Sequence, residues 1–196
     1  GIIGYLGFGS GVKSSVIALN GLKKLEYRGY DSWGIACLNG SGFDLVKQVG
    51  KIGGVDESVL ASFNGHLALG HSRWATTGVV SQENAHPHTD CVGEIALVHN
   101  GIIENFEELK KALEEKGHVF KSQTDTEVVA HLIEGESGAL ETRVRMAVAK
   151  LHGSFALLVV SAREPQKLVG VRKESPLVVG LGANGVFVAS DVLAFL

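Results

Sequence analysis

GSFALLVVSAREPQKLVGVRKESPLVVGLGANGVFVAS, residues 153–190, contains four short apolar runs separated by turn residues. The runs are residues 155–160, 168–171, 177–179 and 186–189. Apolar, β-branched runs that are bounded by Gly, Pro, Asn and Ser are typical of strands. Because only short turns separate them, the segment predicts strands that pair mostly antiparallel.

Similar runs occur earlier in the chain, at residues 2–6, 33–38, 67–69 and 95–98. Several are almost continuous in apolar residues, which is typical of strands that are covered on both faces. The stretch NGSG, residues 39–42, predicts a hairpin turn after the second of these runs.

Four segments show the apolar spacing of helices, namely residues 14–28, 105–116, 124–134 and 139–152. Ser14 and Asn105 are the predicted N-caps of the first two, and Thr124 with Glu127 forms a predicted capping box for the third. Helices and strands do not alternate regularly, so we expect an α+β fold in which helix layers are separate from the sheets. One domain over residues 1–196 is the simplest organisation.

The composition of the 196-residue chain indicates a packed core, since 45% of residues are apolar and 20% are charged. A net charge of -3 without a basic stripe argues against nucleic acid or an anionic membrane as partner. No apolar run is long enough to span a bilayer, and no signal peptide is evident. Two cysteines are too few for a disulfide scaffold, so we expect a cytoplasmic protein.

Three segments place polar residues where packing alone does not require them. In HSRWATTG, residues 71–78, Arg73 beside Trp74 predicts either a bidentate carboxylate site, with Thr76 adding a hydroxyl, or a surface stack. In HNGIIEN, residues 99–105, Asn100 and Gly101 predict either a hairpin turn or an oxyanion hole. In QTDTE, residues 123–127, Asp125 predicts either a charge in the first helical turn or a carboxylate that holds a substrate ammonium.

The stretch NAHPH, residues 84–88, raises the question of a metal site because Cys91 follows it closely. His86, His88 and Cys91 supply suitable ligands, but the spacing places no fourth one. We therefore predict no metal here, and instead a loop whose turn is fixed by Pro87. Cys37 lies in an apolar run and is expected to be a buried, unreactive thiol.

Taken together, these segments resemble the class II glutamine amidotransferase domain of the N-terminal-nucleophile hydrolases. The motifs that carry the resemblance occur in order along the chain: GIIGY at 1–5, LEYRGYDS at 25–32, SRWAT at 72–76, NAHPH at 84–88, VHNGIIEN at 98–105, TDTE at 124–127, GSFAL at 153–157 and SPLVVGLG at 175–182. LEYRGYDS followed by WGIA is similar to the glucosamine-6-phosphate synthase branch. The resemblance implies a four-layer αββα sandwich and no cofactor.

The resemblance also implies roles for individual residues in binding L-glutamine or L-glutamate. Arg73 would bind the α-carboxylate, Asp125 the α-ammonium, and Asn100 with Gly101 the oxyanion. Other pocket residues would be Trp74, Ala75 and Thr76, together with His86 on a loop that closes over the pocket. At Thr77 the sequence departs from relatives, which commonly have His there.

The resemblance finally implies a cysteine nucleophile directly before Gly1. The α-amino group of that cysteine would act as base and then as acid. The sequence begins at Gly1, and neither Cys37 nor Cys91 carries a free amine. The alternative is a module that binds glutamine or glutamate without the thiol. In the family branch named above, the ammonia would pass to a fructose 6-phosphate site in C-terminal sugar-isomerase domains, which these 196 residues lack, to make glucosamine 6-phosphate.

Overall fold

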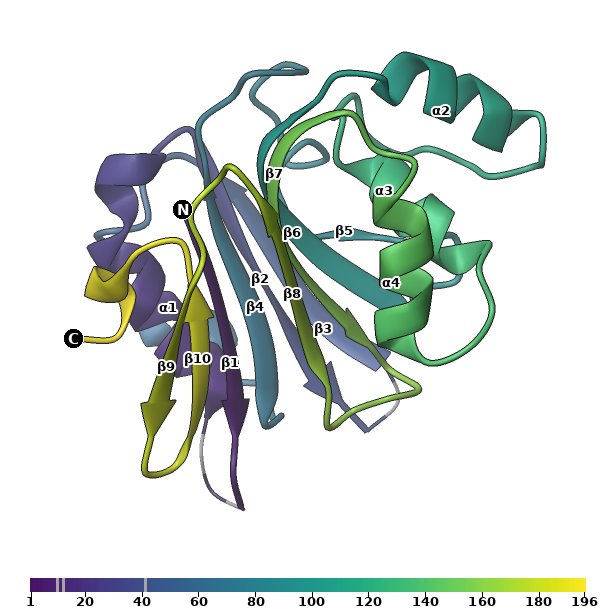
Figure 1. Ribbon diagram of the computed structural model, residues 1–196. Helices are drawn as coiled ribbons and strands as arrows, with labels where there is room; N and C mark the ends of the chain where they lie inside the picture. The colour runs from purple at the N-terminus through teal and green to yellow at the C-terminus, as the bar shows by residue number, and fades with distance from the viewer. Residues whose placement is uncertain (10, 12, 41) are drawn as a thin grey trace.

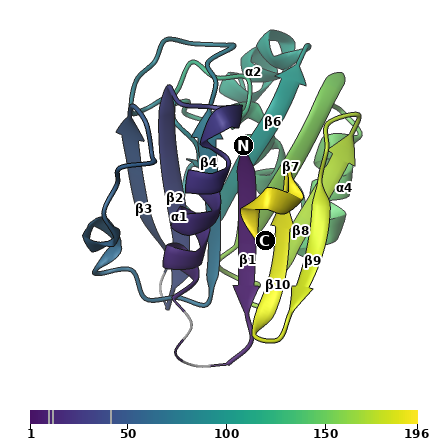
Figure 2. The same cartoon turned by 90° about the vertical axis from the view of Figure 1, so that its left-hand side faces the viewer.

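Two sheets stack face to face between layers of helices in the computed structural model, which describes residues 1–9, 11, 13–40 and 42–196 (Figure 1, Figure 2). The outer face of one sheet is covered by α1 (Ser14–Lys24), and that of the other by α3 (Glu127–Glu134) and α4 (Leu140–Val148). Helix α2 (Phe106–Glu114) packs beside α3. This arrangement confirms the expected α+β fold, a four-layer αββα sandwich.

Every strand pairing of the described residues is antiparallel. The larger sheet has the order β3 (Gly42–Val49), β2 (Ser32–Asn39), β4 (Leu67–Arg73), β1 (Ile2–Gly7), β10 (Gly185–Ala189) and β9 (Val178–Gly182). The smaller has the order β5 (His88–Thr89), β6 (Ile95–Ile103), β7 (Gly153–Ser161) and β8 (Leu168–Lys173). Short 3₁₀ turns occupy Glu26–Arg28, Glu57–Leu60 and Val192–Ala194.

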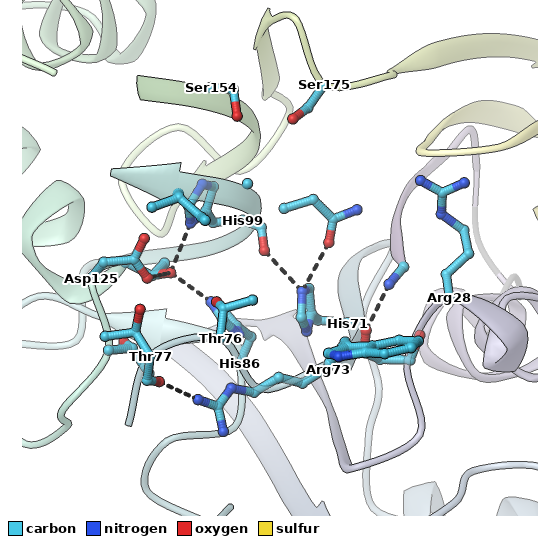
Figure 3. A pocket seen from close by; sticks show the side chains of 18 of the residues that line it. Arg28, His71, Arg73, Thr76, Thr77, His86, His99, Asp125, Ser154 and Ser175 are labelled. Carbon is cyan, nitrogen blue, oxygen red and sulfur yellow. Dashed lines mark hydrogen bonds between the residues drawn. The ribbon is translucent and has the colours of Figure 1, made fainter. Parts of the chain in front are cut away.

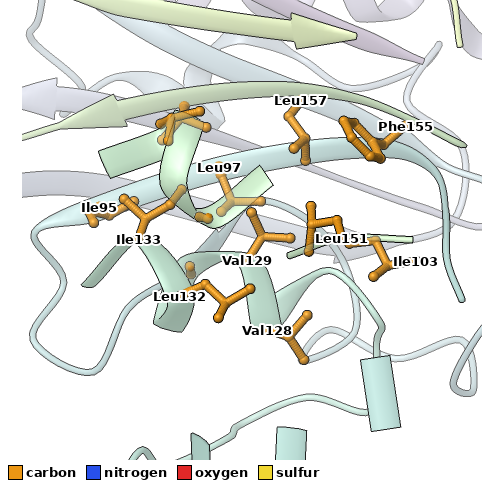
Figure 4. Close-up of a cluster of buried hydrophobic side chains, with 14 of the residues drawn as sticks. Ile95, Leu97, Ile103, Val128, Val129, Leu132, Ile133, Leu151, Phe155 and Leu157 are labelled. Carbon is orange, nitrogen blue, oxygen red and sulfur yellow. The ribbon is translucent and has the colours of Figure 1, made fainter. Parts of the chain in front are cut away.

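The apolar runs predicted as strands all overlap these strands, and their continuity has a simple cause. In β7, Phe155 and Leu157 face the helices α3 and α4 (Figure 4). Ala156 and Leu158 face the other sheet. Successive side chains of a strand point to opposite faces, so a strand between two cores is apolar at every position. Strand β3 was not predicted, because as an edge strand it is largely half-exposed and its polar residues interrupt the run.

Two of the three predicted helix caps are wrong, because backbone groups outside the helices take the polar side chains. The Ser14 hydroxyl donates to the carbonyl oxygen of Gly65 at 2.7 Å and makes no cap bond, and α1 ends at Lys24. The third helix begins at Glu127, whose carboxylate accepts from the backbone N–H groups of Lys121 and Ser122. Short polar side chains often make such competing bonds, so a cap motif alone fixes a helix start poorly.

Other local predictions fare differently. Asn105 does stand at the N-cap of α2, although its side chain bonds Lys150 and His152 rather than the helix. Strands β2 and β3 pair up to Asn39 opposite Gly42, as the NGSG turn predicts, while Ser41 of that turn lies outside the described residues. Among the helices that the structure describes, none has the length and apolar character needed to cross a bilayer.

The strand register brings the polar segments to one end of the sandwich. Ile2 at the start of β1 lies opposite His71 near the end of β4. In the second sheet, Gly101 near the end of β6 lies opposite Phe155 near the start of β7. The two sheets touch here, because Nε2 of His71 lies 2.8 Å from the carbonyl oxygen of His99.

Candidate active site

A pocket of about 600 Å³ opens at this end of the sandwich (Figure 3). The predicted residues that line it are Arg73, Trp74, Thr76, His86, Asn100, Gly101 and Asp125, and Gly1 lines it as well. Ala75 is not among the lining residues, and its backbone N–H donates instead to the Asp31 carboxylate at 2.8 Å. The tertiary structure thus brings together segments that are far apart in the sequence.

Gly1 forms part of the pocket wall through its main chain. Its nitrogen donates to the carbonyl oxygen of Ser72 at 2.6 Å, and the nitrogen of Ser72 donates to the Gly1 carbonyl oxygen at 2.9 Å. These two bonds continue the β1–β4 ladder up to the pocket. The nitrogen atom of Gly1 is therefore held in place beside Arg73.

Asn100 and Gly101 lie inside β6, so the interpretation of this pair as a hairpin turn is wrong. Nε2 of His71 lies 2.8 Å from the His99 carbonyl oxygen and 3.1 Å from Oδ1 of Asn100. Because a carbonyl oxygen only accepts, this Nε2 carries a proton and donates to Asn100 as well. Nδ2 of Asn100 donates to none of the residues that the structure describes, which leaves it available to a ligand.

Arg73 is 3% exposed, so the alternative of a surface arginine stacked on Trp74 is wrong. Its guanidinium donates to the carbonyl oxygens of Thr77, Gly78 and Val79 and thereby anchors the loop below the pocket (Figure 3). The Trp74 ring instead packs against Tyr30, with 5.6 Å between ring centroids, and is 60% exposed at the rim.

Asp125 is buried and stands before the N-cap of α3, rather than in the first helical turn. Its Oδ2 accepts the backbone N–H of Ile103 at 2.8 Å, which fixes the carboxylate against the end of β6. Arg73 and Asp125 thus place one fixed positive and one fixed negative charge in the same pocket. Such a pair complements a ligand that carries both a carboxylate and an ammonium group.

Comparison with known proteins agrees with this geometry. Residues 71–196 match the family model described as a glutamine amidotransferase domain. The chain belongs to this family. It is similar to glutamine–fructose-6-phosphate aminotransferases [isomerizing], with 54% identity to the Thermococcus kodakarensis protein and 52% to the Pyrococcus horikoshii protein, each match covering 100% of the chain. The chain spans about a third, 33%, of the length of these curated relatives.

Solved structures of amidotransferases share the fold of this glutamine amidotransferase domain. The glutamine phosphoribosylpyrophosphate amidotransferase of B. subtilis, complexed with ADP and GMP, superposes with a TM-score of 0.83 at 30% identity. That match covers 99% of the chain and 42% of the other protein. A predicted glutamine amidotransferase of Pseudomonas aeruginosa, with a TM-score of 0.51 and 15% identity, shares the fold alone.

Beneath the pocket of this glutamine amidotransferase domain lies a layer of buried histidines that the sequence analysis did not assemble. The Thr126 hydroxyl lies 2.8 Å from Nε2 of His86 and 2.9 Å from Nδ1 of His99. The His71 and His86 rings lie 4.1 Å apart. Burial lowers the pKa of each of these histidines, well below the usual range for His71 and His86, so all three are neutral at pH 7.

His71, His99 and Thr126 lie within the polar segments of the sequence, but their roles depend on packing. His71 and Asn100 both face the space between the sheets, which only the stacking of β4 on β6 reveals. Tyr27, Arg28, Ser154, Ser175 and Pro176 also line the pocket, from the segment after α1 and from β7 and the loop after β8.

Proposed function

We propose that this glutamine amidotransferase domain hydrolyses the side-chain amide of L-glutamine to glutamate and ammonia. One observation carries the proposal, namely a pocket that holds an arginine, a carboxylate and an Asn-Gly pair around the nitrogen of Gly1. Arg73 then binds the α-carboxylate of the substrate, and Asp125 binds its α-ammonium. Trp74, Thr76 and His86 bound the space between them.

The nucleophile in this proposal is a cysteine joined to the nitrogen of Gly1. That nitrogen is bonded to Ser72 at the pocket wall, so a residue attached to it enters the pocket. Its thiolate attacks the amide carbon of glutamine and expels ammonia, leaving a γ-glutamyl thioester, which water then hydrolyses to glutamate. A free α-amino group with an ordinary pKa near ~8 first accepts the thiol proton and then donates it to the leaving ammonia.

Asn100 and Gly101 form the oxyanion hole in the same proposal. The His71 bond turns the oxygen of the Asn100 amide away and directs its Nδ2 donors to the pocket. Each well-placed donor stabilises the transition state by ~3 kcal/mol in comparable sites. The pair is therefore expected to matter for the rate more than for substrate binding.

A glutamate-release assay tests this chemistry on two versions of the chain, with Cys or with Ser placed before Gly1. We expect turnover with Cys and at least a hundredfold lower turnover with Ser, since the hydroxyl is a weaker nucleophile. In the Cys version, Asn100→Ala should lower kcat by roughly a hundredfold and change KM little. Equal rates for Cys and Ser would overturn the mechanism.

Calorimetry with glutamate separates binding from chemistry. Arg73→Ala should weaken glutamate binding at least tenfold, because a charge-assisted contact to the α-carboxylate is lost. Arg145→Ala on the exposed face of α4 is the matched control and should bind like the parent chain. If Arg73→Ala binds equally well, the α-carboxylate lies elsewhere. Tight binding without turnover in the Cys version would favour a glutamate-binding module instead.

We further propose that the ammonia serves a second site in a larger, cytoplasmic protein. The relatives named glutamine–fructose-6-phosphate aminotransferase [isomerizing] are about three times as long as this chain, which matches 33% of each. In the proposed arrangement, sugar-isomerase domains bind fructose 6-phosphate and receive the ammonia to form glucosamine 6-phosphate. Coupled assays of the longer protein, with glutamine and fructose 6-phosphate together, test this assignment.

A further inference from the structure

A cluster of side chains that could ligate a metal lies at the C-terminal end of α3, away from the pocket. Cys91 follows β5, His118 follows α2, and His131 and Glu134 lie on α3 itself. One sulfur, two imidazole nitrogens and one carboxylate oxygen from these residues all lie within 4.8 Å of one another. Cys91 is close to His86 and His88 in the sequence, whereas the fold turns those two histidines toward Thr126 and Thr124 instead.

Four of the six distances between the ligand atoms of the cluster lie close to those of a tetrahedral site. Sγ of Cys91 lies 3.7 Å from Nδ1 of His118 and 3.5 Å from Nδ1 of His131. Oε2 of Glu134 lies 2.9 Å and 3.0 Å from the same two nitrogens. Ligand atoms around a four-coordinate zinc ion are separated by about 3.3–3.6 Å, given metal–ligand bonds of ~2.0–2.3 Å. These four distances differ from that range by at most about 0.4 Å, and the two remaining pairs of ligand atoms lie within 4.8 Å.

The charges of the cluster also suit a divalent cation. One thiolate and one carboxylate neutralise two positive charges, and two neutral imidazoles complete the set. The site is sheltered, because the His131 side chain is 1% exposed and those of His118 and Glu134 are 15% and 19% exposed. A mixture of sulfur, nitrogen and oxygen ligands favours zinc over magnesium or calcium, which prefer oxygen ligands alone.

A supporting carboxylate stands behind one of the ligands. Nε2 of His131 has no hydrogen-bond partner among the described residues, but it lies 3.7 Å from Oε1 of Glu127. The Glu127 carboxylate is itself held by the backbone N–H groups of Lys121 and Ser122. Histidines that bind a metal commonly point their second nitrogen at such a carboxylate, which orients the ring.

Hydrogen bonding alone accounts for the cluster less well. A single carboxylate oxygen, Oε2 of Glu134, would have to accept from both imidazoles and from the backbone N–H of Cys91 at 3.3 Å. The thiol of Cys91 would then face two imidazole nitrogens that both carry protons. A cation at the centre uses all four groups as electron-pair donors instead.

We propose that Cys91, His118, His131 and Glu134 bind one zinc ion in a structural site. All four positions come from the protein, so no coordination position is left open for catalysis. The ion would join α3 to the turn after β5 and to the segment after α2. On binding, the Cys91 thiol releases its proton to solvent and the sulfur bonds the metal as thiolate.

Titration of the metal-free chain with cobalt(II) and zinc(II) tests the proposal. Cobalt should bind with a stoichiometry of one and give the thiolate charge-transfer band and the intense visible bands of four-coordinate cobalt. Zinc should displace it, protect Cys91 from alkylation and raise the Tm. Cys91→Ser should abolish the charge-transfer band and weaken zinc binding at least tenfold, whereas Cys37→Ser, which removes the buried thiol outside the cluster, should change neither.

The outcomes separate zinc binding from a hydrogen-bonded cluster. Absence of stoichiometric cobalt or zinc binding, or unchanged binding in Cys91→Ser, would overturn the proposal. If Cys91→Ser does not fold, the cobalt spectrum and the metal-dependent protection of Cys91 in the unaltered chain decide alone. None of these measurements depends on glutamine hydrolysis, so the proposed function stands or fails separately.

Discussion

At position 101 of β6, in the pocket wall, the backbone leaves no room for any residue larger than glycine. The φ of Gly101 is 125°, and a Cβ there would lie 2.1 Å from the Ser154 carbonyl oxygen. We expect Gly101→Ala to lower the free energy of unfolding by about 2–3 kcal/mol, through backbone strain and this clash. Urea denaturation measures the change. Gly54→Ala is the control, because a Cβ there meets no atom within 4 Å, and equal stability of the two variants would contradict the expectation.

Cys37 and Asn100 show how far a single residue can be interpreted from the sequence. An apolar run around Cys37 predicts a buried thiol, and the structure confirms it, with burial raising the pKa of that thiol. The Asn-Gly pair is ambiguous in the sequence, because the same two residues suit a hairpin turn and an oxyanion hole. The pairing of β6 with β7 excludes the hairpin turn.

At the scale of elements, Arg143 ties α4 to α3 and to the start of β6. Its Nε donates to the carbonyl oxygen of Ile133 at 3.1 Å, and NH1 lies 2.9 Å from Oε1 of Glu94. The side chains of Arg143 and Glu94 are both at least nine-tenths buried. Arg143→Met should therefore cost about 3 kcal/mol of unfolding free energy, because it leaves Glu94 short of its buried partner.

Arg163 provides the matched control for this ion pair. It also contacts Glu94, at 3.1 Å, but its side chain is 74% exposed. An exposed pair is screened by water, so Arg163→Met should cost less than about 1 kcal/mol. Thermal or urea unfolding of the two variants compares them directly. A loss for Arg163→Met as large as that for Arg143→Met would show that burial does not decide the strength of this pair.

For the whole molecule, the buried histidines predict how stability depends on pH. In four buried histidines, the pKa lies below its ordinary value, mainly because burial disfavours the charged imidazolium. These are His71, His86, His88 and His99. The unfolded chain protonates these side chains below pH ~6.5, whereas the folded chain keeps them neutral. The unfolded state then binds more protons, so stability is lost as the pH falls below ~6.5, by up to about 1.4 kcal/mol per pH unit for each histidine.

Urea unfolding at pH 7.5 and pH 5.5 measures this dependence. His88→Gln should make the loss smaller by about 1.4 kcal/mol, because one neutral histidine is removed while an amide can still bond the Thr124 hydroxyl. If His88→Gln loses as much stability as the parent chain between the two pH values, His88 is not neutral in the folded state.

The sequence by itself determined the apolar runs, and hence most strands, the helical segments and the α+β class. These features depend on local spacing, since a strand between two cores must be apolar throughout. Most of the residues that line the pocket lie within the ordered motifs of the sequence. What the sequence could not supply was the pairing of side chains across elements, including Ser14 with Gly65 and His71 with Asn100.

Only the tertiary structure decided which polar groups meet. Cys91 is separated from His118 by 27 residues and from His131 by 40, so no local spacing indicates that they are neighbours. Folding places them together because α3 packs along β5 and β6 and beside α2. Local residue order thus determines the elements, whereas long-range packing determines the glutamine pocket and the proposed zinc site, because both are built from segments distant in the chain.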